Sequence, residues 1–179
     1  MKRVMIIGQP GSGKSTLARL LGERTGLPVI HIDKIHWKPG WIERSTARKT
    51  ALCREIHRQN EWIFEGGHSA TWEERQERCD TLIWLDFPVW LRLWRVIVRT
   101  LRHYGHSRAD LPENCPEQFR WEFYVWIWTT RKTARAKMGA LFEATTPPKA
   151  CIKLKTRREV AAFLDQVAER GSAMKDVEQ

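Results

Sequence analysis

Residues 4–15 read VMIIGQPGSGKS, an apolar run followed directly by a glycine-rich loop. Residues 8–15 match G-x-x-x-x-G-K-[ST] at every fixed position, and the segment from Ser15 to Thr25 has the pattern of a helix. A strand, such a loop and a helix in this order cradle nucleotide phosphates, because the glycines let backbone N–H groups point inward around phosphate oxygens. The sequence therefore predicts a site for a nucleoside triphosphate.

Two side chains of this loop have specific expected roles. Lys14 reaches the β- and γ-phosphates, and the hydroxyl of Ser15 is a ligand for Mg²⁺. ATP and Mg²⁺ are therefore the predicted cofactors. The residues expected to bind ATP are Gly8, Gly11, Ser12, Gly13, Lys14, Ser15 and Thr16.

The chain has 179 residues, enough for one domain with a hydrophobic core. We expect a single domain over residues 1–170 and a flexible tail over residues 171–179. No run approaches the roughly 20 apolar residues that cross a bilayer, and the start lacks the apolar segment of a signal peptide. These features predict a cytoplasmic protein with no membrane partner. The four cysteines are scattered, which disfavours both a zinc site and a disulfide framework.

The formal net charge of +10 points to polyanionic partners, and both nucleotides and nucleic acids qualify. The ten tryptophans are compatible with base stacking on a single strand or with a place in the core. Because Trp62, Trp84 and Trp126 stand inside apolar runs, the core is the favoured place for most of them. Non-specific contact with nucleic acid stays an open alternative.

Apolar runs alternate with helical patterns along the whole chain. The expected strands are Val4–Ile7, Val29–Ile32, Trp62–Glu65, Thr81–Leu85 and Ala150–Leu154. The expected helices are Ser15–Thr25, Ser45–Gln59, Thr71–Arg78, Val89–Tyr104, Pro116–Met138 and Arg157–Arg170. This alternation predicts an α/β fold with a five-stranded parallel sheet sandwiched by helices. In such folds, ligands bind beyond the carboxyl ends of the strands.

Two carboxylates stand at the edge of the sheet that carries the loop. Asp33 ends the second expected strand, and Glu65 ends the third. Such acids hold Mg²⁺ through water or accept the proton of an attacking hydroxyl, so both are candidate catalytic residues. Asp33 is also, with Ser15, a candidate metal ligand. Helix capping is the alternative role, and the roles of Asp86 and His68 stay open.

The helix expected from Val89 carries arginines on one side. Arg92, Arg95, Arg99 and Arg102 fall in one stripe about 80° wide, and no acidic side chain accompanies them. A polyphosphate would offset their mutual repulsion, and arginine stabilises the charge that develops during phosphoryl transfer. A solvated basic face is the alternative. The opposite side is apolar and is expected to pack on the core; it consists of Trp90, Trp94, Ile97, Val98 and Leu101.

Residues 104–116 are polar, contain Arg108 and predict a short lid, for which an ordinary loop is the alternative. A lid keeps water away from the γ-phosphate. The next segment, residues 119–128, is apolar on nearly all sides. It predicts a helix that is buried in the core or in a homodimer interface.

Over residues 3–164 the chain resembles the DNA topology modulation proteins of the FlaR type, which are P-loop proteins related to adenylate kinase. The matching segments are the phosphate loop with LA at 17–18, LPVIHID at 27–33, WKPGW at 37–41, WIFEG at 62–66, LDFP at 85–88, LWR at 93–95 and CPE at 115–117. The resemblance implies a P-loop NTPase fold of the nucleotide-kinase type and an effect on DNA supercoiling.

The chain is also similar, more distantly, to adenylate kinase itself. This similarity implies that Arg95 and Arg99 contact ATP and the transferred phosphoryl group, and that Arg108 acts from the lid. The arginine that grips a monophosphate acceptor in that family is replaced within EGGHSAT at 65–71, although Arg44 or Arg48 could substitute for it. Asp33 looks more like the aspartate that faces a hydroxyl acceptor in shikimate and gluconate kinases.

Two functions follow from these features. The first is an ATP-dependent, Mg²⁺-requiring phosphotransferase for an unidentified small-molecule acceptor, whose catalytic residues are Lys14, Asp33, Glu65, Arg95, Arg99 and Arg108. The alternative is a nucleic-acid-binding regulator of DNA topology in which ATP binding switches the conformation. The sequence shows no recognition helix, zinc finger or aromatic RNA-binding motif that would favour this alternative.

Overall fold

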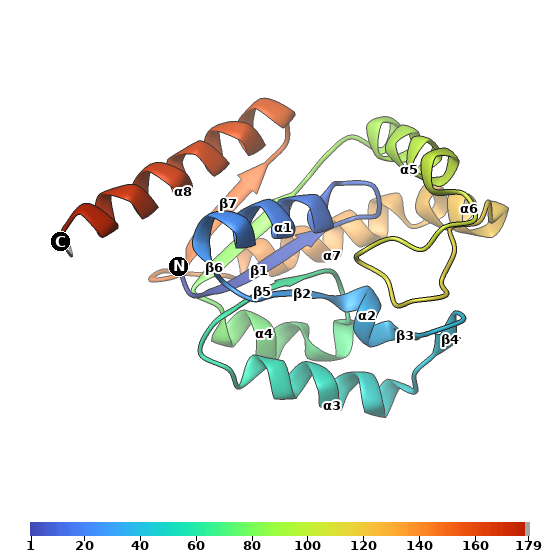
Figure 1. Ribbon diagram of the computed structural model, residues 1–179, viewed down its shortest axis with the longest axis horizontal. Helices are drawn as coiled ribbons and strands as arrows, with labels where there is room; N and C mark the ends of the chain where they lie inside the picture. Colours follow the sequence, from blue (N-terminus) through green and yellow to red (C-terminus); the bar gives the residue numbers. More distant parts are fainter. Residues whose placement is uncertain (178–179) are drawn as a thin grey trace.

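The structure is a computed structural model that describes the backbone of residues 1–177 and the side chains of residues 1–169. At its centre lies a five-stranded parallel sheet with the order β2-β5-β1-β6-β7 (Figure 1). Its strands are β1 (Arg3–Gly8), β2 (Val29–His31), β5 (Trp62–Glu65), β6 (Thr81–Leu85) and β7 (Ala150–Leu154). The predicted sheet is confirmed, with every strand end within one residue of its expected place.

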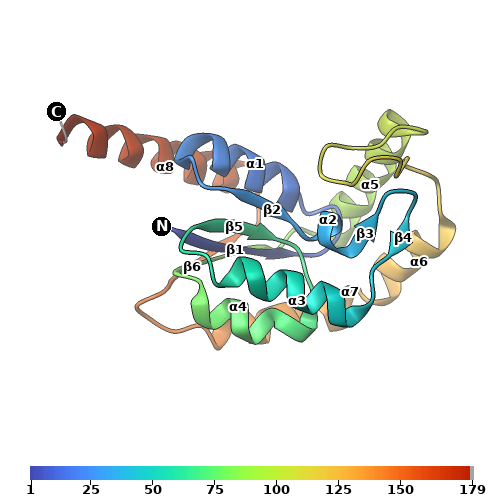
Figure 2. The ribbon, with the colours of Figure 1, turned by 60° about the horizontal axis from the view of Figure 1, so that its bottom comes forward.

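Helices cover both faces of the sheet, as the sequence predicts. On one face lie α1 (Lys14–Thr25) and α8 (Arg157–Val177). On the other lie α3 (Thr46–His57), α4 (Trp72–Arg78) and α7 (Arg131–Glu143), as Figure 2 shows. Helix α8 extends beyond its expected end at Arg170, and residues 178–179 lie outside the described residues. The flexibility of the expected tail over 171–179 therefore stays a prediction.

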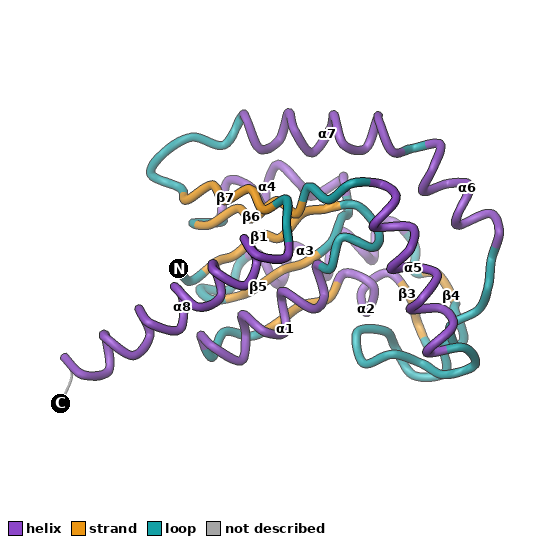
Figure 3. The backbone as a smooth tube through the Cα atoms, turned by 90° about the horizontal axis from the view of Figure 1, so that it is seen from above, coloured by secondary structure: helices purple, strands orange, loops and turns teal. Residues whose placement is uncertain are grey.

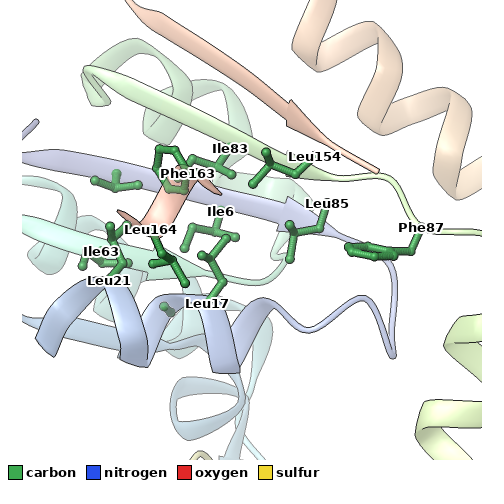
Figure 4. Close-up of a cluster of buried hydrophobic side chains, with 12 residues drawn as sticks. Ile6, Leu17, Leu21, Ile63, Ile83, Leu85, Phe87, Leu154, Phe163 and Leu164 are labelled. Carbon is green, nitrogen blue, oxygen red and sulfur yellow. The ribbon is translucent and has the colours of Figure 1, made fainter. Parts of the chain in front are cut away.

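The three central strands β1, β5 and β6 are buried on both faces, which explains their nearly continuous apolar sequence, whereas the edge strands β2 and β7 are only partly buried. In β1, Val4 and Ile6 face the α1 and α8 layer, whereas Met5 and Ile7 face the opposite layer. Figure 4 shows the first of these cores, in which Ile6 packs near Leu17 of α1 and Leu164 of α8. Within the described part of the chain, no helix is both long and apolar enough to cross a membrane.

Several short elements stand between the strand ends and the cleft beyond them. After β2 come helix α2 (Ile32–His36) and a hairpin of β3 (Trp37–Lys38) and β4 (Ile42–Glu43). After β5 comes η1 (Ser69–Thr71), a single 3-10 turn. Asp33 therefore lies in the first turn of α2 rather than at the end of a strand.

The long helix predicted over Pro116–Met138 is two helices in the structure. Helix α6 (Trp121–Thr129) begins only after an extended segment, and α7 follows it at Arg131. The side chains of Thr129 and Thr130 donate hydrogen bonds to the carbonyls of Val125 and Trp126, respectively, at 2.9 and 2.6 Å. Such back-bonding competes with regular helix hydrogen bonds and accounts for the break.

The expected orientation of α5 (Val89–His103) is wrong. Its apolar stripe faces outward, with Trp90 69% and Trp94 62% exposed, and Arg92 on the other side is 2% exposed. The arginine side turns inward because backbone carbonyls of the phosphate loop accept its guanidinium hydrogen bonds. In Figure 3, α5 and α6 lie beyond one end of the sheet rather than against its faces.

The expected burial of tryptophans holds for two of the three named residues. Trp62 and Trp84 lie in the core between the sheet and the α3, α4 and α7 layer. Trp126 is instead 50% exposed, because α6 buries mainly Tyr124 and Ile127 against α5. The aromatic segment over residues 119–128 is therefore largely a surface feature of this chain.

Candidate active site

The phosphate loop passes very close to the backbone of α5. Gly11 has φ 77°, and a Cβ atom at this position would stand 2.3 Å from the carbonyl oxygen of Arg92. Gly13, with φ 95°, precedes the first residue of α1 in a left-handed conformation. Both positions require glycine, because side chains rarely tolerate a positive φ and the space at Gly11 is already filled.

Side chains from distant segments hold the loop in shape. Arg92 donates a hydrogen bond from Nη1 to the carbonyl of Pro10 at 3.2 Å, and Arg95 donates from Nη1 to the carbonyl of Ser12 at 3.1 Å. Gln9 donates from Nε2 to the carbonyl of Arg131 at the start of α7, at 2.9 Å. These hydrogen bonds tie the loop to α5 and α7, and Arg92 acts as its support.

The loop has the properties of an anion cradle. The first N–H groups of α1 have no acceptor within the helix and point towards the loop. The hydroxyl of Ser12 is buried without a hydrogen-bond partner among the described residues. Lys14 lies over the loop with Nζ 3.4 Å from the carbonyl oxygen of Gln9. Triphosphate oxygens would satisfy all three kinds of donor, so these residues fit the nucleotide that the motif predicts.

Burial lowers the pKa of Lys14, and the negative charges of Glu65 and Asp33 oppose this shift. A buried ammonium of this kind is poorly solvated by water. Phosphate oxygens next to it would restore the lost solvation. The loop therefore favours a ligand with several negative charges.

Glu65 connects two strand ends with the first turn of α1. Its Oε1 accepts a hydrogen bond from the Ser15 hydroxyl at 2.9 Å and lies 2.9 Å from Nδ1 of His31. Only 3% of the Glu65 side chain is exposed. The two oxygen donors Ser15 and Glu65 therefore stand together beside the cradle, and hard oxygen ligands of this type suit Mg²⁺.

Within the described residues, no group of three or more His, Cys, Asp or Glu side chains is arranged to bind a metal ion. This arrangement still fits Mg²⁺, which usually keeps several waters and binds through one or two protein oxygens together with substrate phosphates. Ser15, Glu65 and Asp33 are the residues that would hold it.

Asp33 lines the cleft from the first turn of α2. Within the described residues its carboxylate makes neither a hydrogen bond nor an ion pair. Burial raises the pKa of Asp33, and the nearby charge of Glu65 raises it further, whereas Lys14 and Arg108 oppose the shift. A carboxylate without a partner beside a phosphate loop is free to accept a proton from a bound ligand.

Arg99 and Arg108 meet at one carboxylate. The Nε atoms of Arg99 and Arg108 lie 3.1 and 2.7 Å from Oε1 of Glu117, and Nη1 of Arg108 lies 2.9 Å from Oδ2 of Asp110. Burial lowers the pKa of Arg99, and the charge of Arg108 adds to this effect. The structure therefore brings a helix arginine and a lid arginine to the same wall of the cleft.

The segment predicted as a lid lies over the cleft and rests on the hairpin. The backbone N–H of Gly40 donates to the carbonyl of Asn114 at 3.1 Å, and Nε1 of Trp41 donates to the carbonyl of Pro116 at 3.1 Å. The resulting cleft has a volume of about 1620 Å³ and extends along the loop from α8 to the hairpin. Its size accommodates a nucleotide together with a second small molecule.

Several residues weighed from the sequence have other partners. Asp86 accepts two hydrogen bonds of 2.8 Å from Arg135 and lies 3.3 Å from Nζ of Lys153. Nη1 of Arg44 donates to the carbonyls of Lys34 and Ile35, at 2.9 and 3.1 Å, near the end of α2.

His68, Arg48 and Arg102, which the sequence suggests as further binding residues, do not line the cleft either. His68 is paired with Thr50 through Nε2 at 2.9 Å. Arg48 and Arg102 are exposed. Among the described residues of the arginine stripe, Arg92 and Arg95 bind carbonyls of the phosphate loop, and Arg99 lines the cleft.

Sequence reasoning missed part of the cleft wall. The rings of Trp37 and Trp41 meet edge to face at 5.3 Å, and Trp72 lines the same end of the cleft. The Pro-Gly pair at 39–40 between two tryptophans is a turn signal that could have predicted the hairpin. No local signal pointed to Trp72.

The fold and the loop together define a P-loop protein of the α/β class. A family model described as an AAA domain matches residues 4–98, more than half of the chain, and the chain belongs to this family. The matched region contains the loop, Asp33, Glu65 and the first part of α5.

One curated protein that resembles this chain is a kinase. A cytidylate kinase of Aeropyrum pernix is 32% identical over 116 residues, which cover 53% of this chain. The chain spans 63% of the length of that relative. This similarity and the family model support a P-loop protein of the kinase type.

Two solved structures share the fold across nearly the whole chain. A shikimate kinase from Acinetobacter baumannii in complex with shikimate has a TM-score of 0.56 at 17% identity, covering 98% of this chain and 95% of its own. A gluconokinase from Sinorhizobium meliloti has a TM-score of 0.51 at 15% identity, covering 94% of each chain.

Proposed function

We propose that this protein is an ATP-dependent kinase that transfers the γ-phosphoryl group of ATP to a hydroxyl group of a small molecule. The observation that carries the proposal is the unpartnered carboxylate of Asp33 in the cleft beside the phosphate loop. A protein that only binds and senses ATP has no need for such a group. An enzyme that must take a proton from an attacking alcohol needs one in this position.

The transfer step assigns a role to each candidate residue. The acceptor oxygen forms a bond to the γ-phosphorus while the bond from this phosphorus to the β–γ bridging oxygen breaks, and its electron pair leaves with ADP. The proton of the acceptor hydroxyl passes to the carboxylate of Asp33. Lys14 and the loop N–H groups hold the phosphates, and Arg95, Arg99 and Arg108 stabilise the charge of the moving phosphoryl group.

Mg²⁺, when bound, would neutralise phosphate charge and fix the geometry of the triphosphate. Ser15 contributes a hydroxyl oxygen for this ion, and Glu65 holds that hydroxyl at 2.9 Å. Asp33 faces the same region and would contact the water shell of the ion.

Arg108 of the lid and Arg99 of α5 must leave their present partner before they can contact the phosphates. In the structure, Glu117 is the counterion of both Arg99 and Arg108. A triphosphate carries more negative charge than one carboxylate and competes for these guanidiniums. We therefore expect the two arginines to move from Glu117 towards ATP when it binds.

The alternative reading, a regulator of DNA topology that uses ATP as a switch, finds no support in the family model or in the similar proteins. Arg92, Arg95 and Arg99 of α5 also face the loop and Glu117 rather than an outer surface. The family model and the similar proteins thus give no support for an effect on DNA supercoiling, and the kinase is the function that we propose.

Acceptor-dependent release of ADP tests the proposal. The full chain is mixed with ATP and Mg²⁺, with and without pools of nucleosides, nucleotides, sugars and hydroxy acids, and ADP is followed by a coupled assay. We expect ADP release to rise with at least one pool and to disappear in Lys14→Ala. Asp86→Asn is the matched control, because it also removes a carboxylate near a strand end but lies outside the cleft, and it should keep activity. Equal ADP release in all pools would contradict the proposal.

A further inference from the structure

A second hollow lies beside the main cleft, between α5 and the start of α8. Four arginines line it, namely Arg95, Arg99 and Arg102 of α5 and Arg157, the first residue of α8. Among the described residues, no carboxylate lines it. Its volume of about 500 Å³ is within the range of small-molecule sites. We call this hollow the arginine groove.

Three of the four arginines have no acidic partner. Within the side chains that the structure describes, Arg95, Arg102 and Arg157 form no ion pair. Glu159 lies in the first turn of α8, but its carboxylate accepts a hydrogen bond of 2.7 Å from the backbone N–H of Lys155 and does not line the groove. These three guanidiniums are therefore available to a ligand.

The guanidiniums of the arginine groove are close enough to repel one another. Burial lowers the pKa of Arg95, and the positive charge of Arg157 lowers it further. Arg99 has a counterion in Glu117 but shares it with Arg108. An anion placed among like charges of this kind offsets their repulsion. The groove therefore carries positive charge that the described side chains leave largely uncompensated.

The arginine groove shares a wall with the main cleft but has residues of its own. Arg95 lines both, and its Nη1 donates to the carbonyl of Ser12 in the phosphate loop at 3.1 Å. Trp94, Val98 and Arg102 line only the groove. The phosphate loop already supplies a cradle for the donor triphosphate. The charge contributed by Arg102 is therefore additional to the charge that the donor meets in the main cleft.

We propose that the arginine groove is a second ligand site, which binds the diphosphate or triphosphate group of a small molecule other than the ATP in the phosphate loop. Guanidiniums bind phosphate oxygens in pairs, and several of them around one hollow suit a ligand with more than one phosphate. Trp94 is 62% exposed and adds a flat aromatic face on which a base can stack. Nucleotides and inorganic pyrophosphate share the phosphate chemistry. The inference goes beyond the proposed kinase function and does not depend on it.

Fluorine NMR of the full chain labelled with fluorotryptophan tests the inference, because Trp94 reports on the groove. The signal of Trp94 is identified by its loss in Trp94→Phe. One equivalent of a non-hydrolysable ATP analogue with Mg²⁺ fills the phosphate loop first, and pyrophosphate is then added at physiological salt. We expect the Trp94 signal to shift until it saturates, whereas the signal of Trp62, which is buried in the core, stays in place.

Two arginine variants provide the second arm. Arg102→Ala removes a guanidinium that lines only the groove, so it should weaken pyrophosphate binding at Trp94 by about tenfold or more. The affinity for ATP and the release of ADP should stay unchanged. Arg158→Ala is the matched control, because Arg158 is exposed next to Arg157 but lines neither hollow. Its pyrophosphate affinity should stay within about twofold of that of the unmodified protein.

Uridine diphosphate in place of pyrophosphate distinguishes the two sources of the phosphate group. Tighter binding of the nucleotide indicates that its base stacks on Trp94, and equal binding indicates an inorganic ligand. A Trp94 signal that does not shift, or that shifts as readily in Arg102→Ala, would overturn the inference. Equal weakening by Arg102→Ala and Arg158→Ala would overturn it too, because only the general charge of the surface would then matter. Weaker ATP binding in Arg102→Ala would show that the groove belongs to the donor site and would also overturn it.

Discussion

Replacement of Asp33 by asparagine should make the protein more stable and nearly inactive at neutral pH. Asparagine has almost the same shape but cannot accept a proton from the acceptor. Loss of a general base costs about 10² to 10⁴ in rate. At 1.36 kcal/mol per factor of ten, this is about 3 to 5 kcal/mol of transition-state stabilisation. We therefore expect kcat to fall by this factor while the affinity for ATP stays within about threefold.

The change in stability follows from the raised pKa of Asp33. Burial and the charge of Glu65 disfavour its ionised form, so the folded protein binds this proton more tightly than the unfolded chain does. Below the ordinary pKa of an aspartate the carboxyl is neutral in both states, and the ionised form carries no penalty. As pH rises through the raised pKa, stability is lost. Asp33→Asn should therefore gain stability at pH 7 and lose this advantage as the solution is made acidic.

Asp86→Asn should behave in the opposite way. Hydrogen bonds from Arg135 are the main cause that lowers the pKa of Asp86, so its ionised form stabilises the fold at neutral pH. The replacement should cost about 1 kcal/mol at pH 7, since one partner is largely exposed. The difference from the unmodified protein should shrink as pH falls through the lowered pKa. Activity should be unaffected.

Chemical denaturation at a series of pH values measures both effects, together with a coupled ADP assay on the same samples. The reasoning on Asp33 is refuted if Asp33→Asn keeps normal turnover with an acceptor. It is refuted equally if that variant is less stable than the unmodified protein at pH 7, because the carboxylate would then have a structural partner. The ADP assay also gives a pH profile, in which activity should be lost as pH falls through the raised pKa of Asp33.

Three further predictions concern the nucleotide and the charge of the chain. Lys14→Ala should weaken ATP binding in calorimetric titration while its thermal unfolding stays close to that of the unmodified protein; unchanged affinity would contradict the loop assignment. Arg95→Ala and Arg99→Ala should each lower the transfer rate by at least about 10²-fold in a rapid-quench assay, with poor rescue by lysine; normal turnover in both would leave them without a catalytic role. Binding to duplex DNA should fall steeply between about 50 and 200 mM salt and ignore ATP in filter binding. A complex that is selective for supercoiled DNA and survives physiological salt would refute this expectation.

The centre of the sheet could be predicted from the sequence because β1, β5 and β6 are short apolar runs that fit a position covered on both faces. Ile63 and Phe64, for example, point to opposite layers and are both fully buried. The loop could be predicted because its backbone path needs glycine at fixed places. Burial of a strand and the backbone path of the loop both depend on neighbouring residues, so they can be predicted from a short stretch of sequence.

The orientation of α5 could not be predicted in the same way. Its two stripes are equally clear, and the apolar one normally faces the core. The arginine stripe faces inward because Arg92 and Arg95 bind carbonyls that lie about 80 residues away in the sequence. Only the fold shows that these acceptors are present.

The properties that suggest a function also come from long-range neighbours. Asp33 was a candidate from its place near a strand end, but its lack of a partner depends on every element around the cleft. The same holds for the pairing of Arg108 with Glu117, and for Trp72 beside the hairpin. The sequence predicts that Asp33 and Glu65 lie near the loop. The structure shows which of the charged side chains around them already have partners.

The most direct test of the kinase account is the fate of the terminal phosphate of ATP. The full chain is incubated with γ-labelled ATP, Mg²⁺ and pools of nucleosides, nucleotides, sugars and hydroxy acids, and the labelled products are separated by chromatography. The account predicts label in at least one phosphorylated acceptor, none in that product with Lys14→Ala, and at least about 10²-fold less with Asp33→Asn. Label found only in inorganic phosphate, or retained in ATP with every pool, would contradict it.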